Sequence, residues 1–256
     1  MSLPTFVIAG AQKSGTSSLS ATLRRHPDVF MATPKELHFF DRHFDRGVGW
    51  YEEQFTPARR HQQRGEATPS YLYHAEARAR LVETLPDTKV VVILRDPVKR
   101  AYSHYWHTHR RGQEDQPFEK ALELESQRLA NGGRKERSRY SYTDRGHYID
   151  QLIDLSAHRD RSLLHVMLLE DLISERVPTL EGLLKFVDAD VAPLAGIEEI
   201  HTNRYRVLNA KSGRKEVASY PPMDAATQER LSEQFADSTK RLADWLDRDL
   251  SVWSSG

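Results

Sequence analysis

Three short apolar runs stand out from an otherwise polar chain, and each is long enough for one β-strand. They are TFVIAG (5–10), KVVVILR (89–95) and LLHVMLLE (163–170). None of them alternates cleanly between apolar and polar positions, which is typical of strands covered on both faces in a parallel sheet. The pattern therefore predicts three buried parallel strands.

Helix-like stretches separate these runs. The expected helices cover residues 16–25, 74–85, 97–111, 117–130, 145–158, 178–188 and 224–247. Pro97 suits the first turn of its helix, and Asp224 is a suitable N-cap for the last one. Strands that alternate with helices indicate βαβ units. We expect an α/β fold with a central parallel β-sheet flanked by helices, in one domain spanning 1–256.

Composition narrows the function classes. Lys and Arg together number 37, as do Asp and Glu, so no global basic field favours nucleic acid or an anionic membrane as a partner. Cysteine is absent, which excludes thiol catalysis, disulfides and cysteine zinc sites. No apolar stretch approaches the roughly 20 residues that span a bilayer, and no export signal is visible at the N-terminus. We expect a cytoplasmic protein; its oligomeric state is not readable.

The highly charged segment 110–145 allows two interpretations. It contains NGG (131–133) and RKERSR (134–139). One interpretation is a solvated helix and loop. The other is a mobile cover over an acceptor site, because binding elements often lie on such segments. The sequence does not decide between them.

The first predicted strand runs directly into GAQKSGTSS (10–18). A strand, a glycine turn and a helix start place backbone N–H groups around an anion. Gly10 and Gly15 have the spacing of a triphosphate-binding loop, but Thr16 stands where the lysine belongs and Lys13 lies inside the loop. This placement favours a shorter, diphosphate-like anion that is handled without metal, and sulfuryl transfer fits it. The alternative is a strand–turn–helix joint with no ligand.

The second run ends at Arg95, and a helix with Ser103 follows it in KVVVILRDPVKRAYSHYWH. Ligands of open α/β sheets bind at the carboxyl ends of the strands. An arginine there can grip a phosphate through two hydrogen bonds, and Ser103 can add a donor. The alternative is an arginine paired with a carboxylate.

GAQKSGTSSL and VVILRDPVKRAYSHYWH together resemble the two nucleotide-binding motifs of sulfotransferases that use 3′-phosphoadenosine 5′-phosphosulfate (PAPS). The resemblance is strongest to the heparan sulfate sulfotransferase-like branch and its bacterial relatives, and it implies a P-loop NTPase-like sulfotransferase fold. It implies that Lys13 sits at the bridging oxygen and that Arg95 and Ser103 bind the 3′-phosphate. The 5′-phosphosulfate would be held by the first loop, through Gly10, Gln12, Lys13, Ser14, Gly15, Thr16, Ser17 and Ser18.

Further segments carry the resemblance along the chain. HPDVFMATPKELHFFD (26–41) is similar to the segment that holds the catalytic glutamate, which implies Glu36 as general base. The alternative is a surface carboxylate paired with Lys35, as is usual for a Lys–Glu doublet. His38 would share a face with Glu36 if this segment were extended, and would then orient it or bind the acceptor. His107 lies on the same side of its helix as Ser103 and is expected to donate to the sulfuryl group. For both histidines the alternative is a structural role.

The late segment NAKSGRK (209–215) resembles a basic loop that closes over the nucleotide, which implies Lys211, Gly213 and Arg214 as binding residues. Tyr205 is a candidate to stack on adenine. Trp50, Tyr51, Tyr71, Tyr73 and Trp106 could line an acceptor pocket, although most of them are better explained as core.

One departure from the family bears on the acceptor. In GEATPSYL (65–72) the heparan-type enzymes usually have lysine where this chain has Ala67. The missing cation favours a small-molecule or simple carbohydrate acceptor over a heparan-like polymer. The expected activity is sulfuryl transfer from PAPS to a hydroxyl or amine, without metal. The competing hypotheses are a P-loop-like kinase and a nucleotide-binding protein without catalysis.

Overall fold

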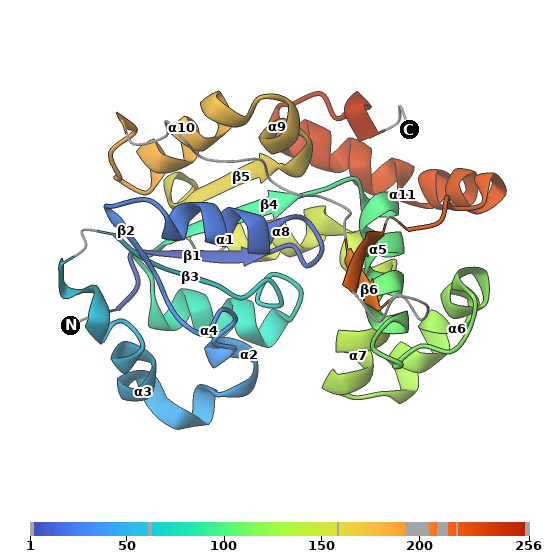
Figure 1. Cartoon of the computed structure of the whole chain (residues 1–256), viewed down its shortest axis with the longest axis horizontal. Coiled ribbons are helices and arrows are strands. Elements are labelled where there is room, and N and C mark those ends of the chain that lie inside the picture. Colours follow the sequence, from blue (N-terminus) through green and yellow to red (C-terminus); the bar gives the residue numbers. More distant parts are fainter. Residues whose placement is uncertain are drawn as a thin grey trace.

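The structure is a computed structural model that describes residues 3–60, 63–157, 159–192, 205–208, 215–218 and 220–253. Its centre is a five-stranded parallel sheet with the strand order β2-β3-β1-β4-β5 (Figure 1). The strands are β1 Phe6–Gly10, β2 Val29–Met31, β3 Gln63–Ala67, β4 Lys89–Leu94 and β5 Leu164–Leu168. The three predicted strands are confirmed as β1, β4 and β5.

Two strands of the sheet were not predicted, for physical reasons that differ. β2 has only three residues, which is too short to form a pattern. β3 reads QRGEA and carries charged and polar side chains, yet its last three residues are buried. Its place next to β1 is set by pairing, with Gly65 opposite Phe6 and Ala67 opposite Ile8. A short antiparallel pair, β6 Tyr205–Leu208 and β7 Lys215–Ala218, was also not predicted.

Helices cover both faces of the sheet, as the α/β prediction requires (Figure 1). The seven predicted helices are confirmed within a few residues at each end, as α1 Thr16–Arg24, α4 Ala75–Thr84, α5 Pro97–His109, α6 Phe118–Asn131, α8 Tyr148–Ser156, α10 Arg176–Phe186 and α11 Ala225–Leu246. Four shorter ones were missed: α2 Phe39–Arg42, α3 Gly47–Glu53, α7 Arg134–Tyr140 and α9 Leu169–Ser174. Pro97 begins α5, and the Asp224 side chain caps α11 by accepting from Thr227 N at 2.9 Å.

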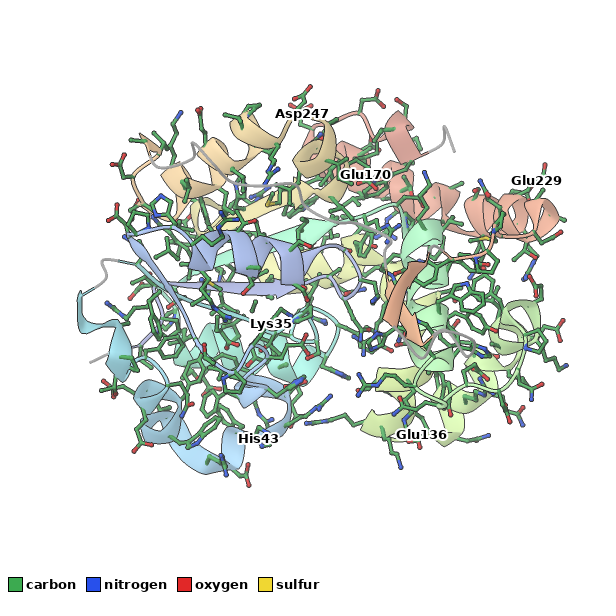
Figure 2. All side chains as sticks on the ribbon, in the orientation of Figure 1. Lys35, His43, Glu136, Glu170, Glu229 and Asp247 are labelled. Atoms are coloured by element: carbon green, nitrogen blue, oxygen red, sulfur yellow. The ribbon has the colours of Figure 1, made fainter. Side chains whose placement is uncertain are left out.

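Two apolar cores follow from the alternation of side chains along the strands. On one face Val7, Val90 and Val92 pack with residues of α4, α8 and α11. On the other face Ile8 and Val91 pack with residues of α1, α9 and α10. Charged side chains of both signs lie on the outside, where Glu229 and Asp247 point into solvent (Figure 2). Because both faces are covered, the carboxyl edge of the sheet is the part of the strands left open to ligands.

Replacement of Gly65 by alanine tests the packing of β3 on β1. A Cβ at Gly65 would lie 2.2 Å from Cζ of Phe6, whose ring is fully buried. Because overpacking a core is costly, we expect Gly65→Ala to lower the free energy of unfolding by about 1–3 kcal/mol in urea denaturation. Gly49→Ala is the matched control, because a Cβ there meets nothing within 4 Å. Equal stability of the two variants would contradict this packing.

Candidate functional site

The loop between β1 and α1 forms a corner at the N-terminal end of α1, which no side chain caps. Gly15, the residue before α1, has φ +93°, a left-handed conformation that favours glycine, and a Cβ there would lie 2.7 Å from Cδ1 of Leu169. No side chain caps α1, and its first turn holds no acidic residue. The first N–H groups of a helix have no partner within the helix, so those of α1 can bind an anion.

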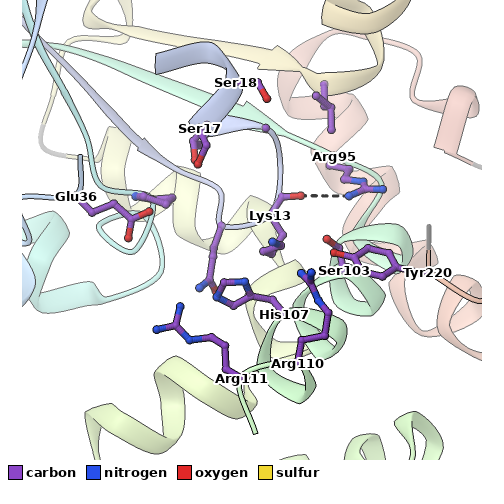
Figure 3. A pocket seen from close by; sticks show the side chains of 15 residues that line it. Lys13, Ser17, Ser18, Glu36, Arg95, Ser103, His107, Arg110, Arg111 and Tyr220 are labelled. Atoms are coloured by element: carbon purple, nitrogen blue, oxygen red, sulfur yellow. Dashed lines mark hydrogen bonds between the residues drawn. The ribbon is translucent and has the colours of Figure 1, made fainter. Parts of the chain in front are cut away.

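A cavity of about 380 Å³, the loop cavity, opens beside this corner (Figure 3). It brings together side chains from the first loop, from the segment before α2 and from the C-terminal end of β4 with α5. Its lining residues are Gln12, Lys13, Gly15, Thr16, Ser17, Ser18, Glu36, Pro69, Arg95, Ser103, His107, Arg110, Arg111, Leu169 and Tyr220. Most of the candidate residues from three separate motifs therefore meet around one space.

Some candidates do not line this cavity. Gly10 ends β1 and approaches Leu72 closely, since a Cβ at Gly10 would lie 2.6 Å from that side chain. Ser14 is fully buried. The side chain of Tyr205 and all of Lys211, Gly213 and Arg214 lie outside the described residues. The roles of these residues stay predictions.

Lys13 lies in the middle of a group of cations. Burial lowers its pKa to about 8, and repulsion from Arg110 and Arg95 adds to the effect. Nη1 of Arg95 donates to the backbone oxygen of Lys13 at 3.4 Å (Figure 3). The part of this shift that comes from Arg110 and Arg95 would be offset by the negative charge of an anionic ligand.

Arg95 and Ser103 are largely buried and both line the loop cavity. Burial lowers the pKa of Arg95, and the Glu170 carboxylate offsets part of this effect. Tyr148 fixes the strand end by donating its hydroxyl to the backbone oxygen of Arg95 at 2.9 Å. Arg95 therefore lines the cavity and is influenced by the charge of a nearby carboxylate, and its role in binding a phosphate stays a prediction.

A second cavity of about 580 Å³ adjoins the first. Five residues line both cavities: Gln12, Glu36, Pro69, His107 and Arg111. The second cavity is otherwise lined by His38, Arg42, Ser70, Thr108, Gln113, Arg134, Lys135, Ser138, Arg139 and Arg145. Four of these belong to α7, so part of the segment 110–145 forms a wall of this cavity; its mobility stays a prediction.

Glu36, His38 and Asp41 form a hydrogen-bonded row that begins at Glu36, which lines both cavities. Nε2 of His38 lies 3.4 Å from Oε2 of Glu36, and Nδ1 lies 3.0 Å from Oδ2 of Asp41. The assumption that this segment is extended is wrong, because Glu36 and His38 have φ angles of 63° and 53°. The contact between them forms nevertheless, because a turn brings the two side chains together.

The row holds opposite charges at neutral pH. Burial alone would raise the pKa of Glu36, but the hydrogen bond with His38 and the charge of Lys35 outweigh it and lower that pKa to about 2. Burial alone would lower the pKa of His38, but Asp41 and Glu36 raise it to about 9. Lys35 also pairs with Glu36 at 2.7 Å, as the surface interpretation of a Lys–Glu doublet suggests. Glu36 is therefore ionised and flanked by two cations.

A buried glutamate, Glu66, is connected by hydrogen bonds to the segment that carries this row. The hydroxyls of Tyr51, Tyr71 and Thr68 donate to it at 2.7, 3.0 and 2.6 Å. Tyr71 also accepts from the backbone N of Phe39 at 2.8 Å, at the start of α2. Tyr51 and Tyr71 are fully buried, so the core interpretation of these two aromatic residues is confirmed.

Three of the four predicted catalytic residues have left-handed backbone conformations. Lys13 has φ 70°, Glu36 63° and His38 53°; among the described non-glycine residues the others with positive φ are Asp188 and Asp247. Such conformations cost free energy in residues with a Cβ and concentrate at functional sites. The fourth residue, His107, is helical, and burial together with Lys13 lowers its pKa to about 4, so its ring is neutral at pH 7.

Five residues of the loop cavity were not predicted from the sequence, namely Pro69, Leu169, Arg110, Arg111 and Tyr220. The two arginines had a usable signal, since they follow His107 by three and four residues and so share its side of the helix. Tyr220 gave no such signal. Its ring stacks on Trp106 at 5.9 Å between centroids, and its position depends on the chain after β7.

Two absences among the described residues bear on cofactors and membranes. No group of three or more His, Asp or Glu side chains in that part of the chain is arranged to hold a metal ion. No helix within it has the length and apolar character needed to cross a bilayer. Asp96, the carboxylate that follows β4, caps α5 by accepting from Val98 N at 2.8 Å.

Residues 3–220 match the sulfotransferase domain family. The chain belongs to this family. It is 45% identical over 106 residues to human heparan sulfate glucosamine 3-O-sulfotransferase 3B1, a match that covers 41% of this chain and 27% of the relative. It is 38% identical over 106 residues to the membrane-associated sulfotransferase kil1 of Dictyostelium discoideum, covering 40% and 22%. The match thus spans about a quarter of the length of these relatives.

The fold of this sulfotransferase domain also matches solved structures. A sulfotransferase from Alicyclobacillus acidocaldarius is 26% identical, with a TM-score of 0.82 over 99% of this chain and 100% of the other. The sulfotransferase domain from the curacin biosynthetic pathway is 12% identical, with a TM-score of 0.52 over 92% and 98%, and shows the fold alone. The predicted sulfotransferase fold is confirmed.

Lys13 provides a test of the electrostatics of this domain. We expect NMR titration of the lysine side chains to show one group with a pKa near 8, which disappears in Lys13→Arg. Removal of a neighbouring cation in Arg110→Ala should raise that pKa, because the repulsion from Arg110 is then lost while burial remains. A set of lysines that all titrate close to 10.5 in the wild-type protein would contradict the arrangement.

Proposed function

We propose that this protein is an enzyme that transfers a sulfuryl group from PAPS to a hydroxyl, or an amine, of a carbohydrate or small-molecule acceptor. The observation that carries the proposal is the loop cavity. An uncapped helix N-terminus, Lys13, Arg95 and Ser103 surround it, and the carboxylate of Glu36 faces the same space. These groups match the needs of a donor with charged groups at both ends of its ribose, beside a base for the acceptor. PAPS is the co-substrate. The cytoplasmic location of the protein stays a prediction.

In the proposed reaction, Glu36 accepts the proton of the acceptor hydroxyl as its oxygen bonds to sulfur. The bond between sulfur and the bridging oxygen breaks, and its electron pair remains on the 5′-phosphate of the leaving 3′-phosphoadenosine 5′-phosphate (PAP). Lys13 stabilises the charge that develops on this oxygen. His38 orients Glu36 through the 3.4 Å contact and is itself held by Asp41. His107, neutral at pH 7, supplies a hydrogen bond to the sulfuryl group.

The second cavity supports an acceptor that carries negative charge. Six arginine and lysine side chains line it together with the protonated ring of His38, against the single carboxylate of Glu36. The six are Arg42, Arg111, Arg134, Lys135, Arg139 and Arg145. Arg145 is buried, its Nη1 has no partner in the described structure, and its guanidinium lies 4.0 Å from the centroid of the Tyr73 ring. The named human relative acts on heparan sulfate, an anionic carbohydrate. These cations support a charged acceptor despite the missing lysine at Ala67.

Glu36→Gln tests the proposed function. The variant keeps the shape of the side chain but cannot accept a proton, so we expect transfer of labelled sulfate from PAPS to fall by about 10²–10⁴-fold. Calorimetry should show PAP binding to the variant and the wild type with similar affinity. ATP with magnesium is the comparison ligand. Binding of ATP–magnesium but not PAP would favour a kinase and overturn the proposal, and PAP binding without transfer to any acceptor would favour a binding protein.

Matched acceptors test the charge of the acceptor. A uronic-acid oligosaccharide and the same oligosaccharide with reduced carboxyl groups differ only in charge. Because charge-assisted hydrogen bonds to arginine are strong, we expect the carboxylate form to have a KM about tenfold lower, with the difference shrinking at high salt. Equal KM values at low salt would contradict an anionic acceptor while leaving the donor assignment intact.

A further inference from the structure

The boundary between the two cavities is where a group must cross from donor to acceptor. Of the five residues that line both, Gln12 and Pro69 are uncharged and Glu36 is ionised. His107 is neutral at pH 7, because its pKa is lowered to about 4. Arg111 is the remaining one, and an arginine keeps its charge at neutral pH. It is thus the one cation among the residues shared by the two cavities.

The end of α5 presents Arg111 to this boundary. The helix ends at His109, and the backbone N of Arg111 still donates to Thr108 O at 3.1 Å. Gly112 follows with φ +65° and turns the chain away. Arg111 lies four residues after His107 and therefore on the same side of the helix, and Figure 3 shows its side chain extending past His107 in the direction of Glu36.

The guanidinium of Arg111 is also available for binding. It is exposed, and within the described residues it forms no hydrogen bond or ion pair. Its neighbours are engaged: Nε of Arg110 donates to Trp106 O at 3.1 Å, and Arg134 pairs with Glu76 at 2.6 Å. A guanidinium presents a planar fork of donors that matches two oxygens of one oxyanion group.

We propose that Arg111 is a catalytic residue that binds two non-bridging oxygens of the sulfuryl group and holds it in line between donor and acceptor. The inference rests on the proposed function. Arg111 neither gains nor loses a proton in the transfer step. It stays bound to the same sulfuryl oxygens while the bond from sulfur to the bridging oxygen breaks, with the electron pair going to PAP, and the bond from the acceptor oxygen to sulfur forms.

PAPS and PAP differ only by the sulfuryl group, which gives a test that needs no acceptor. We expect Arg111→Ala to weaken PAPS binding about tenfold in calorimetry, and PAP binding less than about twofold, because a charge-assisted pair is lost only with PAPS. Arg111→Lys keeps the charge but not the fork, so its loss of PAPS affinity should be smaller. Thermal unfolding of both variants, at an exposed site, checks that they fold as the wild type does.

Two arginines serve as controls. Arg110 lines the loop cavity alone, so Arg110→Ala should weaken PAPS and PAP alike. Arg134 lines the second cavity and not the loop cavity, so Arg134→Ala should leave both affinities unchanged. If the wild type binds both nucleotides, the inference is overturned when Arg111→Ala loses the same affinity for PAPS and PAP, or loses affinity for neither. A wild-type protein that binds neither nucleotide would overturn the proposed function and the inference with it.

Discussion

The concentration of positive charge at the carboxyl edge of the sheet is the constraint on which the site depends. Lys13, Arg95, Arg110 and Arg111 line one cavity, and the carboxylate that faces them is Glu36. The cost of this arrangement is visible in the lowered pKa of Lys13, to which Arg110 and Arg95 both contribute after burial. Folding tolerates the repulsion because the sheet and α5 hold these groups in place. A ligand with several negative charges relieves it, so the same repulsion becomes a source of affinity.

The second constraint is the shape of two turns. Lys13 is held left-handed beside Gly15, and Glu36 and His38 are held left-handed beside the end of β3. Backbone contacts fix the latter pair, since Glu36 N donates to Ala67 O at 3.2 Å and Phe39 N to the Tyr71 hydroxyl at 2.8 Å. The hydroxyl in turn is tied to buried Glu66. The buried side chain of Glu66 thus helps to hold the segment that positions the Glu36 carboxylate at the cavity.

Sequence reasoning succeeded where the chemistry is local. The loop with Lys13 and the strand end at Arg95 are contiguous patterns, and parallel strands carry both to one edge. It failed where position depends on distant packing. β3, with the sequence QRGEA, shows no apolar pattern, because its buried glutamate accepts hydrogen bonds from Tyr51 and Tyr71. A hydropathy pattern does not reveal such distant partners. Tyr220 belongs to the cavity only because of where the chain turns in space, and the segment around Glu36 is turned rather than extended.

The low pKa of Glu36, about 2, bears on how such a carboxylate serves as a base. A general base usually works best with a pKa near the working pH. The related transfer of phosphoryl groups passes through a loose transition state, in which the nucleophile has formed little bond. In a loose sulfuryl transfer the acceptor oxygen becomes strongly acidic only once it bonds to sulfur, and a weak base then suffices. Lys35 and His38, which keep the pKa low, also offset the repulsion between Glu36 and an anionic donor. Glu36 is therefore a weaker base, but its carboxylate can lie close to the negatively charged donor.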